Sequence, residues 1–444
     1  MRATEKLGIF LVTILLLTLP VLGACSDDDD TPIATVTPTA AEPTQEPTIE
    51  PTTEPTQEPT AEPSPVEEVT ITIGNLTDKT GPASRAMTIV DMALEDLAEY
   101  FNDEILVPGA KLKVVSYDTQ YDPSKDRPGY EWLKERGADV IVCGFPTPGV
   151  TLKPFLDEDE IMLFSMTHDE AMTDPPGWVF CLGFPGTVPG PTLLKWIAEN
   201  DWDYASKGPA KVGGAGWTGP YFEALLRGME EYCDAHPDQF TWEGGYLTNF
   251  SQIWTSEVEA LKDCDYVMPP GGGWPTFGRE FRDAGGTGKF VCFESQAAYI
   301  GLASQAIGWD GIDKSLVTLP NRWWNEDTQI PNLAKQLLSE NHPDSVEEII
   351  RAGTPYIGPI GSYYAALSII AETLSTYGPQ NFNSQVLYDT AQSFSMAYGG
   401  CEELNFTDTK RVSWNHLGVY EVSAAEEDIV RKDPNWQPLV YLNQ

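Results

Sequence analysis

Residues 69–101 read VTITIGNLTDKTGPASRAMTIVDMALEDLAEYF, which predicts a β-strand followed by an amphipathic helix. Val, Ile and Thr dominate residues 69–74, and runs of such β-branched residues favour strands. Between Ala83 and Phe101, apolar side chains recur at helical spacing, at Ile89, Met92, Ala93, Leu97 and Phe101. One strand followed by one helix is the repeating unit of α/β proteins.

The same alternation continues along the chain and then starts again. A first series of strand patterns covers residues 69–74, 111–117, 138–143 and 161–165, and a second covers 210–216, 240–246, 265–268, 289–293 and 315–320. A helix-rich stretch at 328–377 and a β-rich segment at 411–422 follow. Strands separated by helices predict parallel sheets with helices on both faces. We therefore expect an α/β protein with two Rossmann-like lobes.

Several motifs in this order resemble those of type I periplasmic solute-binding proteins, in particular the branched-chain amino-acid (Leu/Ile/Val-type) binding proteins of ABC importers. The motifs are ITIGNLTDKTGPAS (71–84), GADVIVCGFPTPGV (137–150), IMLFSMTHDEAMT (161–173), VFCLGFPG (179–186) and KVGGAGWTGPYFEALLRGMEE (211–231). The resemblance covers roughly residues 69–425. It implies two lobes joined by a multi-strand hinge, with the ligand cleft between them.

The resemblance also implies how the chain is divided between the lobes. Lobe 1 is expected to comprise residues 69–184 and 320–395, and lobe 2 residues 185–319 and 396–444. The first hinge crossing is expected at 179–186 and the second at 317–322.

The N-terminus has the pattern of an export signal. Arg2 and Lys6 precede an apolar run from Leu7 to Leu22, which is short for a membrane span of about 20 residues. The tetrapeptide Leu22-Gly23-Ala24-Cys25 resembles a bacterial lipobox, which implies cleavage after residue 24 and a lipid on Cys25. The alternative is an ordinary cleaved signal with a cysteine beside the cut. We expect an exported protein held at the outer face of the cell membrane by its lipid alone.

Residues 25–68 form a linker with too few apolar residues to build a core. Glu-Pro-Thr recurs through this segment, and such a composition favours an extended, solvated chain. The net charge of the chain is −40, and most of it lies beyond the linker. A domain this acidic lacks the basic patch that neutralises phosphates, so we expect no nucleic-acid partner.

Six cysteines follow Cys25, and an exported chain permits disulfides. Sequence alone does not choose among their pairings, and we expect at most one or two bridges. The six are Cys143, Cys181, Cys233, Cys264, Cys292 and Cys401.

In open α/β sheets, ligands bind beyond the carboxyl ends of strands. For lobe 1, the resemblance implies ligand contacts from Thr147 and from Ser165, Thr167 and His168. Prolines on both sides of Thr147 remove backbone donors that would otherwise bind a carboxylate. The alternatives are that Ser165 and Thr167 cap a helix and that His168 is an ordinary loop residue.

For lobe 2, the resemblance implies an aromatic cover and an acidic partner for a ligand ammonium. Tyr221 matches the cover, Trp217 lies at a strand end beside it, and Glu294 follows strand 289–293 at the acidic position. Trp323 lies just past the second crossing and is a further candidate. The alternatives are a solvated Glu294 and hinge packing for Trp323.

We find no common catalytic or metal-binding motif in the sequence. It contains no H-E-x-x-H or G-x-S-x-G, and its four histidines lack metal-ligand spacing. We therefore expect no enzyme, cofactor or metal. We expect a monomeric solute-binding protein that captures an amino acid, amide or related polar solute and delivers it to ABC permease subunits. The alternatives are a ligand-sensing module for a separate receptor and, less favoured, a surface-anchored hydrolase.

Overall fold

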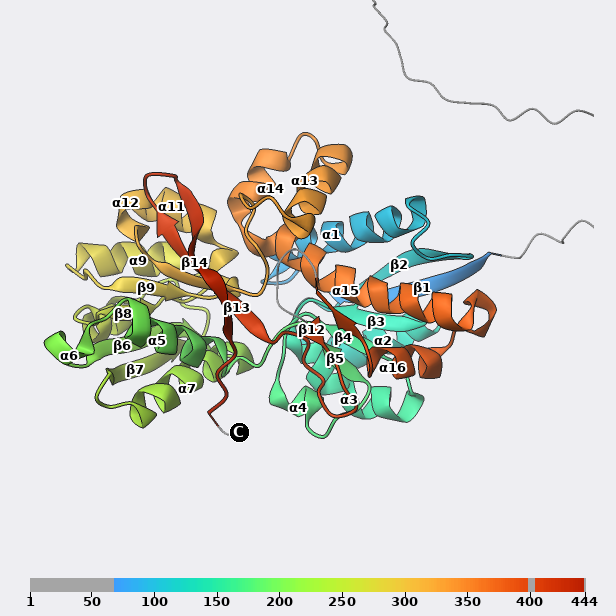
Figure 1. Ribbon diagram of the computed structural model, residues 1–444, viewed down its shortest axis with the longest axis horizontal. Helices are drawn as coiled ribbons and strands as arrows, with labels where there is room; N and C mark the ends of the chain where they lie inside the picture. The colour runs from blue at the N-terminus through green and yellow to red at the C-terminus, as the bar shows by residue number, and fades with distance from the viewer. Residues whose placement is uncertain (1–67, 398–403, 443–444) are drawn as a thin grey trace, which may run out of the picture. The chain divides into compact units, whose positions relative to one another are not determined.

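The computed structural model describes residues 68–397 and 404–442, which fold around two main β-sheets (Figure 1). The predicted signal peptide, Cys25 and all of the linker except Glu68 lie outside these residues. Helices and parallel strands alternate through most of the chain, which confirms the predicted α/β fold class.

Lobe 1 is built on a five-stranded parallel sheet in the order β2-β1-β3-β4-β5. Its strands are β1 (Val69–Thr77), β2 (Ala110–Asp118), β3 (Val140–Cys143), β4 (Leu163–Ser165) and β5 (Val179–Cys181). Between them lie α1 (Ser84–Asp103), η1 (Pro123–Lys125), α2 (Asp126–Lys134), α3 (Pro146–Asp159) and α4 (Glu170–Thr173). Every residue of β3, β4 and β5 is buried, as expected for parallel strands that are covered on both faces.

Lobe 2 is built on a seven-stranded sheet in the order β14-β13-β10-β9-β8-β6-β7. Its parallel strands are β6 (Ala210–Trp217), β7 (Phe240–Thr248), β8 (Tyr266–Met268), β9 (Lys289–Cys292) and β10 (Leu316–Leu319), and its antiparallel strands are β13 (His416–Ser423) and β14 (Asp428–Pro438). Helices follow the strands: α5 (Pro189–Asn200), α6 (Tyr204–Lys207), α7 (Pro220–Ala235), α8 (Thr255–Leu261), α9 (Trp274–Asp283), α10 (Glu294–Ala297), α11 (Ile300–Ile307) and α12 (Trp309–Ile312).

The two parallel sheets have the same topology. Numbered within its own lobe, each sheet runs 2-1-3-4-5, so β1 of lobe 1 corresponds to β6 of lobe 2, and β4 corresponds to β9. In such a sheet the strand order reverses beside the first strand, and the carboxyl ends at that point are where ligands bind. The residues just past β3 and β4, and just past β8 and β9, therefore occupy equivalent places.

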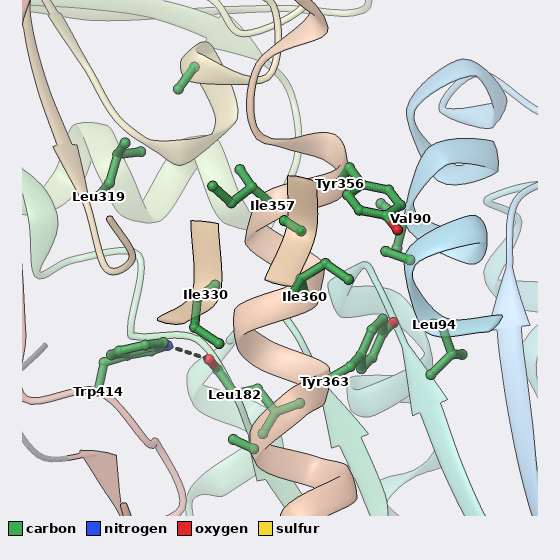
Figure 2. Close-up of a cluster of buried hydrophobic side chains, with 14 of the residues drawn as sticks. Val90, Leu94, Leu182, Leu319, Ile330, Tyr356, Ile357, Ile360, Tyr363 and Trp414 are labelled. Carbon is green, nitrogen blue, oxygen red and sulfur yellow. Dashed lines mark hydrogen bonds between the residues drawn. The ribbon is translucent and has the colours of Figure 1, made fainter. Parts of the chain in front are cut away.

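Helix α15 (Thr354–Tyr377) packs chiefly on α1 of lobe 1 and also contacts α10 of lobe 2. Residues 354–363 of this helix are all buried, as expected for a segment enclosed by protein, whereas Glu372 near its end is exposed. In Figure 2, Tyr356 and Tyr363 point toward α1, while Ile330 lies on the other side of the helix. The remaining elements are α13 (Gln329–Asn341), α14 (Val346–Ala352), η2 (Pro379–Asn381), α16 (Ser384–Ala391), β11 (Ser395–Met396) and β12 (Leu404–Asn405).

Chain segments that join the two sheets lie side by side. Cys181, at the end of β5, forms a parallel bridge with Val412, which precedes β13. The indole Nε1 of Trp414 donates a hydrogen bond to the carbonyl of Leu182 at 2.6 Å (Figure 2). After β10, the Tyr420 hydroxyl of β13 donates to the carbonyl of Asn321 at 3.2 Å. These contacts hold the segments that connect the two sheets next to one another, as in a hinge made of several strands. The predicted residue ranges of the lobes stay a prediction.

The structure differs from the sequence expectations at two places. Helix α3 begins at Pro146, so Thr147 lies in its first turn rather than in a loop; proline suits this position because its missing N–H has no helical partner there. Strand β14 was not predicted, because its sequence DIVRKDPNWQP is mostly polar and lacks a strand pattern. The strand forms by pairing with β13.

Among the described cysteines, Cys143, Cys181, Cys233, Cys264 and Cys292 are buried and free, while Cys401 lies outside the described residues. None of the helices in the described ranges is both long and apolar enough to cross a membrane.

Candidate functional site

The carboxyl ends of β3 and β4 bring two threonine hydroxyls to the same edge of the lobe 1 sheet. Cys143 and Ser165 pair as the last residues of their strands, and Thr147 and Thr167 follow shortly after. Both threonine Oγ1 atoms are buried, and neither has a hydrogen-bond partner among residues 68–397 and 404–442. Since buried hydroxyls are normally paired, these two retain their hydrogen-bonding capacity for a group outside the chain.

The other two residues predicted for lobe 1 use their polar atoms within the protein. Ser165 is fully buried, and its hydroxyl donates to the carbonyl of Thr167 at 2.7 Å, which holds the Thr167 backbone in place. His168 is also buried, and its Nε2 lies 2.7 Å from the hydroxyl of Thr173. Burial lowers the pKa of His168 to about 4, so the ring is neutral at physiological pH. Together with Gly186 of the first crossing, His168 lines a groove of 1370 Å³ that neither Thr147 nor Thr167 lines.

In lobe 2, Trp217 ends β6 and forms an aromatic wall. Its Nε1 donates to the carbonyl of Ser251 at 3.1 Å, and its ring lies 5.3 Å from that of Phe250. Gly272, which follows β8, lies against the outer edge of the indole. A Cβ at Gly272 would lie 2.6 Å from the Trp217 ring and 3.3 Å from Cζ of Tyr299, so only glycine permits this close approach.

Glu294 begins α10 directly beyond β9 and has no cationic partner among the described residues. Burial raises the pKa of its carboxyl to about 7. The residue as a whole is nevertheless only half-buried. Helix α15 covers one side: the Thr354 hydroxyl donates to the Glu294 carbonyl at 3.2 Å, and a Cβ at Gly358 would lie 3.0 Å from Oε1.

Tyr221, in the first turn of α7, lies beside Glu294. Its hydroxyl is hydrogen-bonded to Ser295, and burial together with the Glu294 carboxylate raises the pKa of the phenol. A neutral tyrosine and an unpaired carboxylate thus share one wall. Such a pair suits a cation, which gains charge-assisted hydrogen bonds to the carboxylate and contact with the aromatic ring.

The structure adds two residues that the sequence analysis missed, Tyr121 of lobe 1 and Tyr299 of lobe 2. Burial raises the pKa of Tyr121 to about 12, with smaller electrostatic contributions from Tyr299 and Asp78. The Tyr121 ring also packs on Phe145 at 4.8 Å. Tyr121 has a φ of 55°, a left-handed conformation that is rare for a bulky residue and is often found at functional sites. Only a weak signal in the sequence pointed to these two residues: Tyr121 lies a few positions beyond a strand end, and Tyr299 a few positions beyond a helix end.

Trp323 is not part of this group. It is 2% exposed, and its Nε1 donates to Oδ1 of Asp428 on β14 at 2.7 Å. Its neighbour Trp324 donates to the carbonyl of Gly353 at 2.8 Å and stacks on Tyr356. These contacts correspond to the hinge-packing alternative. The structure therefore brings Thr147 and Thr167 together at one edge, and Trp217, Tyr221 and Glu294 at the other. Their roles as ligand contacts stay predictions.

No group of three or more His, Cys, Asp or Glu side chains within residues 68–397 and 404–442 is arranged to hold a metal ion. The site is built instead from hydroxyls, aromatic rings and one carboxyl. Such groups recognise a solute by shape, hydrogen bonding and charge.

The fold is shared with known solute-binding proteins. The branched-chain amino acid ABC transporter protein from Thermus thermophilus with bound valine is 17% identical, with a TM-score of 0.69, over 84% of this chain and 97% of that chain. The fatty acid ABC transporter substrate-binding protein from Thermomonospora curvata is 15% identical, with a TM-score of 0.68, over 84% and 92%. A solute-binding protein of an ABC transporter from R. palustris in complex with 4-hydroxybenzoate is 13% identical, with a TM-score of 0.66, over 83% and 97%.

No curated protein sequence matches the chain. A profile of the periplasmic binding protein family, however, matches residues 70–342, more than half of the chain. The predicted fold and family are thereby confirmed, as is the prediction of a binding protein rather than an enzyme. With both the architecture and the sequence profile in agreement, the chain belongs to the periplasmic binding protein family.

Proposed function

We propose that the protein is an exported, lipid-anchored, monomeric solute-binding protein that delivers a small polar solute with a cationic group to the permease of an ABC importer. An amino acid or a related amine or amide has the required chemistry. The observation that carries this proposal is Glu294, a carboxyl at the carboxyl end of β9 that has no cationic partner in the described chain. A bound cation supplies that partner.

Each lobe contributes different groups to capture. Glu294 receives the cation, Tyr221 and Trp217 flank it, and the free hydroxyls of Thr147 and Thr167 bond polar atoms at the other end of the solute. A solute that contacts both lobes binds the closed arrangement more tightly than the open one. Binding therefore shifts the population toward the closed form, which the permease recognises.

The cargo depends on these side chains rather than on the fold. Proteins with this fold bind solutes as different as valine and 4-hydroxybenzoate. The prolines at positions 146 and 148 leave few backbone donors for a solute carboxylate. We therefore favour solutes whose dominant charged group is the cation.

The experiment that tests this function is a thermal-shift screen followed by calorimetry on the mature chain with Cys25→Ser, which prevents lipid attachment. The panel contains amino acids, amides, polyamines and short-chain carboxylates. We expect cationic members to raise Tm by mass action, as a ligand specific for the native state does. A protein that responds to no cationic solute, or responds equally after Glu294→Gln, contradicts the proposal.

The lipid anchor is tested separately in cells. Growth with a labelled fatty acid is expected to label the native chain and leave the Cys25→Ala variant unlabelled and released from the membrane. Label on the Cys25→Ala chain contradicts the anchor without affecting the solute-binding proposal.

A further inference from the structure

A second pocket, with a volume of 510 Å³, lies between helices α1, α11 and α14. This volume falls within the range of small-molecule sites. The pocket shares Tyr299 with the candidate site described above, but neither Glu294 nor the free threonine hydroxyls line it.

One side of the pocket is apolar. Ile89 and Met92 of α1 face it together with Leu302 of α11 and Ile349 of α14. The first three are only half-buried, so they offer a solute apolar surface that the protein itself does not cover. Covering such surface is favourable in proportion to the area removed from water.

The same pocket is bordered by two arginines, Arg85 and Arg351, which are exposed and form no ion pair with the described residues. Arg85 lies close enough to Tyr299 to act on its hydroxyl electrostatically. One acidic residue, Glu348, also lines the pocket, so the charged lining has a net positive charge in a strongly acidic protein. Guanidinium groups bind carboxylates with paired, charge-assisted hydrogen bonds.

The lining helices come from different parts of the fold. Helix α1 packs on β2 of lobe 1, whereas α11 packs on α9 of lobe 2, and α14 contacts both α11 and α15. A molecule that contacts α1 and α11 together therefore bridges the lobes. Such a molecule favours the arrangement in which the two helices are close.

From this geometry we propose that the pocket is a second binding site, for a small amphiphilic carboxylate with an apolar body, whose occupancy stabilises the closed arrangement of the lobes. The carboxylate binds Arg85 and Arg351, and the apolar body covers Ile89, Met92 and Leu302. This inference does not depend on the proposed cation at Glu294.

The test is calorimetric titration of the mature Cys25→Ser protein with octanoate, and with octanamide as a neutral analogue of the same shape. We expect octanoate to bind and octanamide to bind about tenfold more weakly, because a charge-assisted hydrogen bond is lost. Arg85→Ala and Arg351→Ala are each expected to weaken octanoate binding by about tenfold, and Glu348→Gln to strengthen it severalfold. Arg279→Ala, an exposed arginine outside the pocket, is the matched control and is expected to change nothing.

Three results overturn the inference: octanoate does not bind, octanoate binds equally well after both pocket arginines are removed, or Glu294→Gln abolishes octanoate binding. The last result assigns octanoate to the candidate site instead. Octanoate binding that survives Glu294→Gln while cationic solutes fail to bind the native protein supports this pocket and contradicts the proposed function, so the two failures are distinguishable. Because the arginines are exposed, an unchanged Tm without ligand shows that the variants are folded.

Discussion

Each lobe contains a carboxyl group at the start of a helix with a pKa raised to about 7, and the two groups differ in their exposure and in their neighbours. In lobe 1, Asp126 at the start of α2 is completely buried. In lobe 2, Glu294 at the start of α10 keeps part of its surface accessible and stands beside Tyr221. Burial raises both pKa values. The comparison shows that a raised pKa alone does not identify a ligand site, because burial in a closed core produces the same shift as partial burial beyond a strand end.

The difference is set by what can approach each group. Asp126 lies among buried groups such as the Cys143 thiol, so no solute reaches it. Glu294 lies past the carboxyl end of a parallel strand, beside Tyr221, and has no cationic partner in the part of the chain that the structure describes. We therefore expect Asp126 to affect stability and Glu294 to affect binding.

The largest expected effect is on stability, through Asp126→Asn. The folded pKa of Asp126 is about 7 and the unfolded value is 3.8, so the native state binds the proton more tightly and stability falls as pH rises from about 4 to 7. Asparagine resembles the protonated form and avoids this loss. We expect Asp126→Asn to unfold at higher urea concentration at pH 8, by about 4 kcal/mol at most, and to match the native protein near pH 4.

The control for that prediction is Asp344→Asn, which changes an exposed carboxyl. It is expected to leave the pH dependence of the urea midpoint unchanged. Native and Asp126→Asn curves that run parallel from pH 4 to pH 8 would show that Asp126 is not the group responsible.

The next largest effect is on binding, through Glu294→Gln. Removing one partner of an enclosed charge pair costs about 3 kcal/mol, so we expect affinity for a cationic solute to fall on the order of 100-fold. In the native protein, affinity is expected to fall by about tenfold for each pH unit below 7, because protonation removes the charge. Calorimetry at pH 5.5, 7 and 8.5 checks both statements.

Glu372→Gln on the exposed side of α15 is the matched control and is expected to bind normally. Equal affinities of the native and Glu294→Gln proteins for the cationic solute at pH 8.5 would show that the Glu294 charge does not contribute to binding.

A smaller effect is expected for the hydroxyls of lobe 1. Thr167→Val replaces a buried hydroxyl that has no partner in the protein by a methyl group of similar size. We expect affinity for the solute to fall about tenfold while the Tm without ligand stays equal or rises slightly. Thr147→Val is expected to behave in the same way. A lower Tm with unchanged affinity would assign these hydroxyls to the protein's own structure.

The smallest effect is expected for Ser165→Ala, which separates Ser165 from its neighbour Thr167. Its hydroxyl donates to the Thr167 carbonyl, so its loss should lower the free energy of unfolding by about 1 kcal/mol. Affinity should change by less than the effect of Thr167→Val. Calorimetric titration measures the affinity, and urea unfolding of the same preparations measures the free energy of unfolding. A larger loss of affinity for Ser165→Ala than for Thr167→Val would indicate that Ser165, and not Thr167, contacts the solute.

Much of the architecture could be predicted from the sequence, because local patterns are repeated in it. The β-branched run of 69–74 and the helical spacing of 83–101 identify a strand and a helix wherever they lie in space. The predicted ends of strands at Cys143, Ser165 and Phe293 each agree with the structure to within one residue. Since ligands bind beyond such ends, Thr147, Thr167 and Glu294 could be selected as candidates before any contact was known.

The sequence by itself determined the strand–helix alternation, the family resemblance and the acidic character of the chain, because these depend on neighbouring residues and composition. Only the tertiary structure decided which polar groups have partners. Ser165 and Thr167 are two residues apart and chemically alike, yet the first hydroxyl is paired and the second is free. Asp126 and Glu294 are both carboxyls at helix starts, yet the first is fully buried and the second is half-buried. Tyr121 and Tyr299 are far apart in the chain, yet Tyr299 acts electrostatically on Tyr121 in the folded protein. Such differences arise from long-range packing, which local sequence patterns do not encode.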